Sequence, residues 1–277
     1  MHLTRTDWAI IAAALAGCGG AALAVQRLAG ARAVAVTVGL ALLVVLVIQF
    51  ELYRRLQDAL RRYHDAPTGN YRQIESLFSL FASLKIEHPL PPMRVAAISP
   101  DFANTLVRLI RETRPRLVLE LGSGLSTIVA AYCLEQIGEG RVMSLEQDAR
   151  YAAISSQNLA ERGLGDRATV VHAPLKDRIV KGQSWPWYDT EAIQALPSID
   201  MVVIDGPLQE RQERRLLRYP ALPILFEKLA PRAVLLLDDG DREDERRVVA
   251  AWMREFEGFE AEQVPGEKGT IVLRRRG

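Results

Sequence analysis

Short apolar runs that end in polar or acidic residues recur along the chain from residue 117 onward. They lie at 117–121, 141–145, 168–173, 199–207 and 233–237, and helix-like segments such as 126–135 and 148–161 separate them. Such runs are typical of strands buried on both faces of a parallel sheet. The tail, 259–275, adds two strands joined by a turn at 266–269. The pattern predicts an α/β fold with ligand-binding residues at the carboxyl edge of its sheet.

The first fifty residues have a different pattern. Two stretches, 8–25 and 33–50, are each 18 residues long and contain no charged residue. That is about the minimum length of a membrane-spanning helix. A short segment, 26–32, connects them. We therefore expect residues 1–50 to form a transmembrane helical hairpin.

Basic residues predict the orientation of this hairpin. Arg54, Arg55, Arg61 and Arg62 follow the second stretch and favour a cytoplasmic position for both ends. Arg27 and Arg32, in the connection, count against this orientation. We expect an inner (plasma) membrane protein whose larger domain faces the cytoplasm.

Two alternatives concern the first stretch alone. The sequence LAGC, which ends at Cys18, is similar to a bacterial lipoprotein cleavage site, and a signal peptide ending near Ala24 is the other alternative. The apolar run continues through Val25, whereas lipoproteins usually turn polar soon after the cysteine. Neither alternative removes the second stretch.

The segment after the hairpin connects it to the larger domain. Residues 51–64 predict a helix, and 65–70 (DAPTGN) predict a break. Apolar residues then recur at helical spacing over 71–85, and Ser99-Pro100-Asp101 is typical of a helix start. We expect a juxtamembrane helix and linker at 51–70 and a second domain at 71–277.

The loop after the first apolar run carries the strongest chemical signal. Glu120 ends the strand, and Gly122 and Gly124 let a ligand approach the backbone N–H groups at the start of the next helix. A dinucleotide loop would have a third glycine where this chain has Thr127. Glu120 would repel a pyrophosphate but pair with an ammonium or sulfonium ligand.

A second acidic residue follows at the next strand end. Glu146 comes 24 residues after Gly122, where a carboxylate accepts hydrogen bonds from both ribose hydroxyls. The alternative is a charge at the positive end of the helix that begins at Asp148. Its position on the strand end favours the ribose role.

The ordered set of acidic strand ends resembles class I S-adenosylmethionine (SAM) methyltransferases over residues 99–275. The resemblance implies a Rossmann-like, mostly parallel sheet of seven strands with an antiparallel last strand. It implies that SAM binds residues at the carboxyl edge, namely Glu120, Gly122, Ser123, Gly124, Ser126, Thr127, Glu146, Gln147, His172 and Asp205.

Three aspartates resemble the metal ligands of metal-dependent O-methyltransferases. Asp205 ends the fourth strand, and Asp238 and Asp239 end the fifth. The resemblance implies a divalent cation, and oxygen ligands suit magnesium or calcium. The chain departs from that family at Leu208, where a lysine is usual, and at Asp239, where an asparagine is usual. The alternative is that the carboxylates cap loops or pair with Arg242 or Arg218.

The proton acceptor is less sharply defined. Asp205, Asp238 and His172 are the candidate catalytic residues, and His172 has an alternative place beside the adenine ring. We expect a long loop at Trp185, Trp187 and Tyr188 whose aromatic rings stack on a ligand or pack the loop. The phrases DGP, RYPALP and LDDGDR resemble a bacterial methyltransferase subfamily of mostly undefined substrates.

Charge and cysteine content exclude other classes. Three of the 35 basic and one of the 34 acidic residues fall in the first fifty, so the remainder is nearly neutral and offers no basic surface for nucleic acid. Cys18 and Cys133 lie in apolar or helical segments and suggest neither a disulfide nor a metal cluster. The oligomeric state is not indicated.

The sequence as a whole predicts a membrane-tethered SAM-dependent methyltransferase. We expect O-methylation of a small-molecule, glycan or lipid-linked acceptor at the cytoplasmic face. The alternatives are an NAD-linked oxidoreductase, which Thr127 and Glu120 disfavour, and a non-catalytic Rossmann-like module that binds a membrane partner.

Overall fold

The computed structural model describes residues 5–95, 97–208 and 216–276, with the side chains at 5–15, 18, 19, 21–34, 37, 59 and 61–68 left out. The chain divides into two compact units, Met1–Thr68 and Gly69–Gly277.

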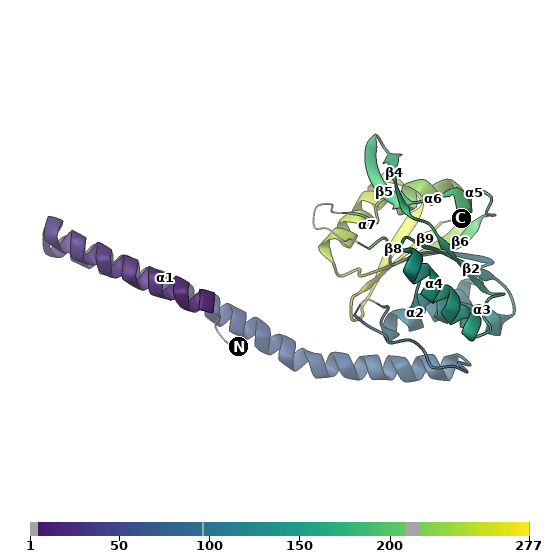
Figure 1. The fold of residues 1–277 in the computed structure, drawn as a ribbon, viewed down its shortest axis with the longest axis horizontal. Helices are drawn as coiled ribbons and strands as arrows, with labels where there is room; N and C mark the ends of the chain where they lie inside the picture. Colours follow the sequence, from purple (N-terminus) through teal and green to yellow (C-terminus); the bar gives the residue numbers. More distant parts are fainter. Residues whose placement is uncertain (1–4, 96, 209–215, 277) are drawn as a thin grey trace. The chain divides into compact units, whose positions relative to one another are not determined.

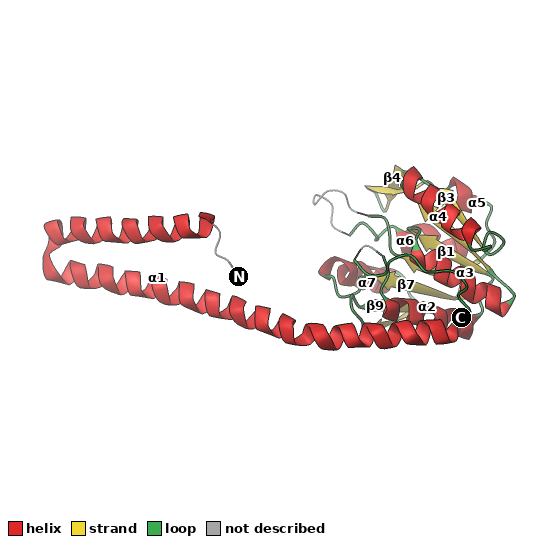
Figure 2. Cartoon of the chain, turned by 60° about the horizontal axis from the view of Figure 1, so that its bottom comes forward, coloured by secondary structure: helices red, strands yellow, loops and turns green. Residues whose placement is uncertain are grey.

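Helix α1, Arg5–Ser83, makes up the described part of the first unit and enters the second. It is helical across 26–32 and 65–70, where the sequence predicts a connection and a break, although its ribbon turns back on itself after a first stretch of several turns (Figure 2). The predicted break at 65–70 is therefore wrong. A proline inside a helix removes a hydrogen bond and bends the helix without having to end it.

The apolar surface of α1 is described over only part of the predicted spans. Most side chains of 8–25, including Cys18, lie outside the described residues, as do three positions in 33–50. Over the residues that were described, no helix contains a stretch long and apolar enough to cross a membrane. From Leu42 to Ile48 the large apolar side chains are exposed on every side of the helix.

The second unit contains the predicted sheet. Seven strands lie in the order β3-β2-β1-β6-β7-β9-β8, with β9 antiparallel to its two neighbours and the others parallel (Figure 1). The strands are β1 Leu117–Leu121, β2 Arg141–Glu146, β3 Ala168–His172, β6 Ile199–Ile204, β7 Leu229–Asp238, β8 Phe259–Val264 and β9 Thr270–Arg275. The Rossmann-like sheet of seven strands is confirmed.

Helices cover both faces of this sheet. They are α2 Pro100–Thr113, α3 Leu125–Ile137, α4 Ala149–Glu161, α5 Glu191–Gln194, α6 Ala221–Leu225 and α7 Glu243–Glu255, with a short 3-10 turn, η1, at Phe226–Lys228. Side chains alternate between two cores, as strand geometry requires. Val118 of β1 packs with α2, α3 and α4, whereas Leu117, Leu119 and Leu121 pack with α6 and α7.

The end of α1 packs on the second unit through polar contacts as well as apolar ones. Asp101, at the start of α2, accepts hydrogen bonds from the Gln73 amide at 2.7 Å and from the Glu267 backbone at 2.7 Å. Leu80 is fully buried beside α2. The helix predicted at 71–85 thus belongs to the sheet domain.

One element departs from the prediction. Residues expected to form a long loop are an antiparallel hairpin of β4, Leu175–Val180, and β5, Gln183–Tyr188. Its outer positions are polar and its inner end is aromatic, because Trp187 and Tyr188 enter the core on the α6 and α7 face. Pro186 in the strand obscures the alternating pattern that marks a hairpin.

Candidate active site

The glycine loop after β1 packs directly on the loop after β6. Gly122 has a φ of +94°, and a Cβ atom there would stand 3.0 Å from the backbone nitrogen of Gly206. The backbone of Gly206 and that of Asp205 both donate to the carbonyl of Leu121, at 2.6 and 3.1 Å. Glycine at 122 is therefore required by conformation and by space, and it brings Asp205 next to the loop.

Glu120 lies beneath this loop. Its side chain is 1% exposed and accepts a hydrogen bond from the Thr127 hydroxyl, which in turn accepts from the backbone N–H of Gly124 at 3.0 Å. Burial raises the pKa of Glu120 to about 7, while the hydroxyls of Ser126 and Thr127 oppose that rise. The carboxylate thus holds the loop in shape, and the expected pairing with an ammonium or sulfonium group does not match its position.

Ser126 and Thr127 are buried as well, at 2% and 0% exposure. They lie in the first turn of α3, so their side chains face the core rather than the open side of the loop. Both were expected to bind the cofactor. The structure places both side chains beneath the loop, where Thr127 is hydrogen bonded to Glu120.

Glu146, at the end of β2, lies against the glycine loop. It accepts hydrogen bonds from the backbone N–H and the hydroxyl of Ser123, at 2.9 and 3.0 Å, and from the backbone N–H of Asp148 at 3.0 Å. A carboxylate has about four acceptor positions, so capacity for a ligand hydroxyl remains. The space beside Gly124 is open, since no atom lies within 4 Å of an added Cβ. The open space beside Gly124 and the carboxylate of Glu146 at the end of β2 together fit a nucleoside group.

The remaining cofactor candidates lie on either side of this site. Gln147 accepts a hydrogen bond from the backbone N–H of Leu208 at 3.1 Å and so connects the ends of β2 and β6. His172 is exposed at the end of β3 and pairs in register with Glu146. Three strand spacings, about 14 Å, separate it from Asp205. At this position His172 is next to the expected cofactor site, and it is too far from Asp205 to act together with it as a base.

The three predicted metal ligands are brought together. Asp205, Asp238 and Asp239 have oxygen atoms that all lie within 4.8 Å of one another, close enough to hold a cation. Neither carboxylate oxygen of Asp238 has a hydrogen-bond partner, and the residue is fully buried. Burial, with the neighbouring carboxylates of Asp205 and Asp239, raises the pKa of Asp238 to about 7.

An arginine side chain already lies within this cluster. Arg218, with its side chain 5% exposed, places one guanidinium nitrogen 3.0 Å from Asp239 Oδ2 and 3.5 Å from Asp205 Oδ1. Its other terminal nitrogen donates to the carbonyl of Asp238 at 2.7 Å and lies 3.5 Å from Glu245. Two of the three candidate ligands, Asp205 and Asp239, are thus engaged by a buried positive charge, whereas the carboxylate oxygens of Asp238 have no hydrogen-bond partner.

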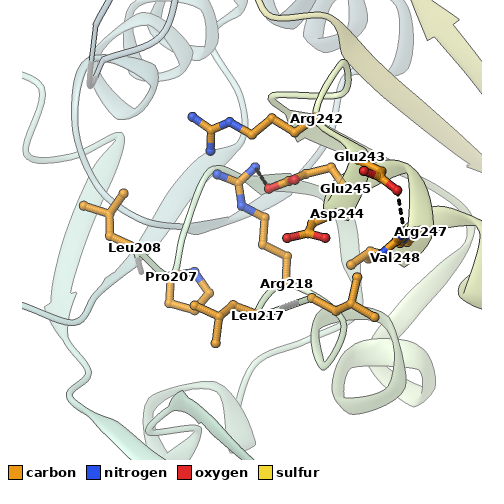
Figure 3. A pocket seen from close by; sticks show the side chains of 11 residues that line it. Pro207, Leu208, Leu217, Arg218, Arg242, Glu243, Asp244, Glu245, Arg247 and Val248 are labelled. Carbon is orange, nitrogen blue, oxygen red and sulfur yellow. Dashed lines mark hydrogen bonds and ion pairs between the residues drawn. The ribbon is translucent and has the colours of Figure 1, made fainter. Parts of the chain in front are cut away.

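A cavity of about 330 Å³ opens beside Arg218. Figure 3 shows the side chains of Arg218 and Arg242 on the same side of it, with Glu245 paired to Arg218. The lining comes from the loop after β6 and from the first turns of α7, and consists of Pro207, Leu208, Leu216, Leu217, Arg218, Arg242, Glu243, Asp244, Glu245, Arg247 and Val248. Its size is at the lower end for small-molecule pockets, and its lining is mostly charged.

The aromatic residues of β5 serve packing. Trp187 and Tyr188 are 1% and 0% exposed, and Trp185 packs on Tyr219 with ring centroids 5.1 Å apart. A Cβ at Gly206 would stand 2.1 Å from the Tyr188 hydroxyl, so this ring lies under the loop that follows β6. Of the two alternatives for these rings, packing is the one that the structure favours.

Some residues of the site carry no recognisable signal in the sequence. Glu245 lies among three acidic residues of the first turn of α7, a common pattern at helix N-termini, and Lys268 lies in the turn between β8 and β9. Lys268 Nζ is 3.8 Å from Asp238 Oδ2. Only the packing of these elements shows that both charges face the aspartate cluster.

Comparison with known proteins agrees with this arrangement. Residues 119–240 match a family model described as "Methyltransferase domain". The matched segment runs from β1 through the glycine loop, Glu146, Asp205 and Arg218 to the aspartates after β7. This finding favours the expected methyltransferase over the NAD-linked alternative.

Solved structures share the fold. A putative O-methyltransferase from Klebsiella pneumoniae superposes with a TM-score of 0.50 at 21% identity, over 76% of this chain and 97% of that one. The SAH-bound Podospora anserina methyltransferase PaMTH1 gives 0.51 at 14% identity, over 80% and 96%. A methyltransferase from Geobacter sulfurreducens gives 0.50 at 17% identity, over 66% and 82%. These likenesses support the class I architecture.

Substitution of Gly124 tests whether the open side of the loop receives the cofactor. No atom lies within 4 Å of a Cβ added at Gly124, so the methyl group of an alanine there would enter the open space without meeting protein atoms. We expect Gly124→Ala to weaken SAM binding by at least about tenfold in calorimetry, because a ligand on the loop N–H groups needs that space. The matched control is Gly165→Ala at an exposed position with equal room. Equal SAM affinity in the two variants would contradict the assignment.

Glu120→Gln tests the buried carboxylate. The folded pKa of about 7 lies above the ordinary 4.5, so the folded chain holds this proton more tightly than the unfolded chain does. The stability that Glu120 contributes is present below about pH 4.5 and is lost as the pH rises through about 7. Between about pH 5 and pH 8 the unfolding free energy of the variant should gain on the order of 2 kcal/mol relative to the parent chain. Parallel pH profiles from urea unfolding would show that Glu120 does not titrate in this way.

Proposed function

We propose that this SAM-dependent methyltransferase transfers the methyl group to an oxygen atom of a small polar acceptor, or of a polar group linked to a glycan or lipid. The observation that carries the proposal is the position of Asp205. Its backbone is hydrogen bonded to the last residue of β1, immediately before the glycine loop. The carboxylate therefore lies between the cofactor loop and the residues that line the charged cavity.

The cofactor is held by residues of the β1 and β2 ends. Bound SAM supplies a methyl group on a positively charged sulfur. The open side of Gly124 receives the nucleoside, and Glu146 accepts a hydrogen bond from a ribose hydroxyl. Gln147 and His172 lie beyond Glu146 and contact the base end of the cofactor. The SAH bound to the Podospora anserina methyltransferase PaMTH1 supports a cofactor of this class.

Asp205 is the residue placed to take the acceptor proton. Its side chain is 21% exposed, whereas those of Asp238 and Asp239 are 1% and 5% exposed. Burial raises the pKa of Asp205 above its ordinary value, although the Arg218 guanidinium opposes that rise. A raised pKa makes a carboxylate a better proton acceptor near neutral pH. Asp238 lies too deep to touch an acceptor, and His172 lies too far away.

The cavity beside Arg218 favours a polar acceptor. Two arginines and three acidic residues of α7 and its N-terminal loop line it, so an acceptor group there meets charges of both signs. The similarity to the putative O-methyltransferase from Klebsiella pneumoniae supports oxygen as the acceptor atom. A hydroxyl needs a base before transfer, and this requirement matches the role given to Asp205.

We also propose that α1 attaches the enzyme to a membrane. Residues 33–50 contain no charge, and the described large side chains there are exposed around the whole helix. A helix that is apolar on all sides needs an apolar environment. We expect the full chain to stay in the membrane pellet after a carbonate wash, and the double variant Leu43→Arg, Leu46→Arg to be released. Recovery of the parent chain in the wash would contradict tethering.

The acceptor is identified by transfer of a labelled methyl group from SAM into membrane extracts and into small-molecule extracts. We expect product in which the methyl carbon is bonded to oxygen. Asp205→Asn should lower the rate by about 100-fold or more, because the amide takes no proton, while its SAM affinity stays near that of the parent chain. Asp177→Asn, at an exposed position of β4, is the control. A methyl–nitrogen product, or an unchanged rate in Asp205→Asn, would contradict the proposal.

A further inference from the structure

We propose that Arg218 is a built-in cation that takes the place of a divalent metal ion at the carboxyl edge of the sheet. The proposal concerns the aspartate cluster, whose oxygens lie within 4.8 Å of one another. Such a cluster of like charges needs compensation when it is buried. Either a bound ion or a positively charged side chain can provide this compensating charge.

The Arg218 guanidinium lies among the three aspartates and forms hydrogen bonds and ion pairs with them. One nitrogen contacts both Asp239 and Asp205, at 3.0 and 3.5 Å, and it also donates to the carbonyl oxygen of Asp205. The other donates to the carbonyl oxygen of Asp238 at 2.7 Å. Arg218 thus contacts the ends of both β6 and β7, the same two strand ends that an ion would bridge.

The position of Arg218 is fixed by the core. The next residue, Tyr219, accepts a hydrogen bond at its carbonyl from the fully buried indole of Trp252 at 2.8 Å. The Tyr219 hydroxyl donates to Glu255 at 2.6 Å. Both partners lie on α7, so the backbone at 218 is held on two sides. The Arg218 side chain is therefore held in place by the packing of the core, unlike an exposed side chain.

Other cations complete the compensation. Arg242 lies 2.9 Å from Asp239 Oδ2, and Lys268 Nζ lies 3.8 Å from Asp238 Oδ2. With Glu245, four carboxylates face three positive side chains, of which Arg218 is buried and Arg242 is mostly exposed. A magnesium or calcium ion needs oxygen ligands at about 2.0 to 2.6 Å, and at that distance from Asp205 and Asp239 it would meet the guanidinium. Repulsion between the two cations, and the lost ligand positions, exclude the ion.

Arg218 is thus a positioning residue. It acts through the carboxylates of Asp205 and Asp239, and it fixes the orientation of the group that takes the acceptor proton. Because Arg218 supplies the positive charge, the enzyme does not need a divalent cation. The inference does not depend on the identity of the acceptor, since ion binding is measured directly, so its failure and that of the proposed function can be told apart.

The test is a titration of the full chain with Mn²⁺, followed by calorimetry and by thermal unfolding. The parent chain should show no saturable Mn²⁺ site. Arg218→Ala should gain one site, and its Tm should rise on the order of 5 °C with Mn²⁺ at about 100 times the dissociation constant. Adding Asp239→Asn to that variant should remove the gain. Arg232→Ala, which removes an exposed charge from the start of β7, is the matched control and should gain nothing.

Three outcomes would overturn the inference. One is a Mn²⁺ site in the parent chain that Asp239→Asn abolishes. The second is a folded Arg218→Ala variant that binds no Mn²⁺, because Arg218 would then not be what excludes the ion. The third is an Arg232→Ala variant that gains a site equal to that of Arg218→Ala. If Arg218→Ala does not fold, Arg218→Gln takes its place in the titration, and the same outcomes apply to it.

Discussion

The ion-pair network of Arg218 is the constraint on which the site depends. It joins the carboxyl ends of β6 and β7 and the first turn of α7, three elements that would otherwise bring four carboxylates together without compensation. Breaking a buried pair by removing one partner leaves an uncompensated charge, which costs about 3 to 5 kcal/mol. Arg218 therefore shapes the acceptor side of the enzyme even though it lies almost entirely below the surface.

The cofactor side is built on a different principle. There the backbone of Gly122 packs closely on that of Gly206, and the Glu120 carboxylate beneath the loop accepts a hydrogen bond from the Thr127 hydroxyl. These two contacts give the loop its shape. Glu146 is already hydrogen bonded to the loop. A site shaped before the ligand arrives loses little conformational freedom on binding. The two sides meet at Asp205, which is hydrogen bonded to the β1 end and paired with Arg218.

Much of this could be predicted from the sequence. Strands that end in acidic residues mark the carboxyl edge, and Gly122 with Glu146 marks the cofactor loop, because these signals are local. The roles of Glu120 and Thr127 could not be read in the same way, since the sequence does not tell whether a strand-end carboxylate faces the ligand or the core. The β4–β5 hairpin was missed because its aromatic and proline residues hide the alternation.

The position of Arg218 is the clearest example of a non-local feature. It lies 13 residues after Asp205 and 20 before Asp238, with no periodicity to connect it to either. Both a metal and an arginine partner were compatible with the same three aspartates. Only the packing of Trp252 on the Tyr219 backbone directs the guanidinium into the cluster.

The most direct measurement is a crystal structure of the full chain grown with S-adenosylhomocysteine and Mn²⁺, with anomalous data at the manganese edge. We expect the nucleoside on the loop beside Gly124 with its ribose at Glu146, Arg218 between Asp205 and Asp239, and no anomalous peak at the aspartates. A manganese peak within coordination distance of Asp205, Asp238 and Asp239, with Arg218 displaced, would contradict it.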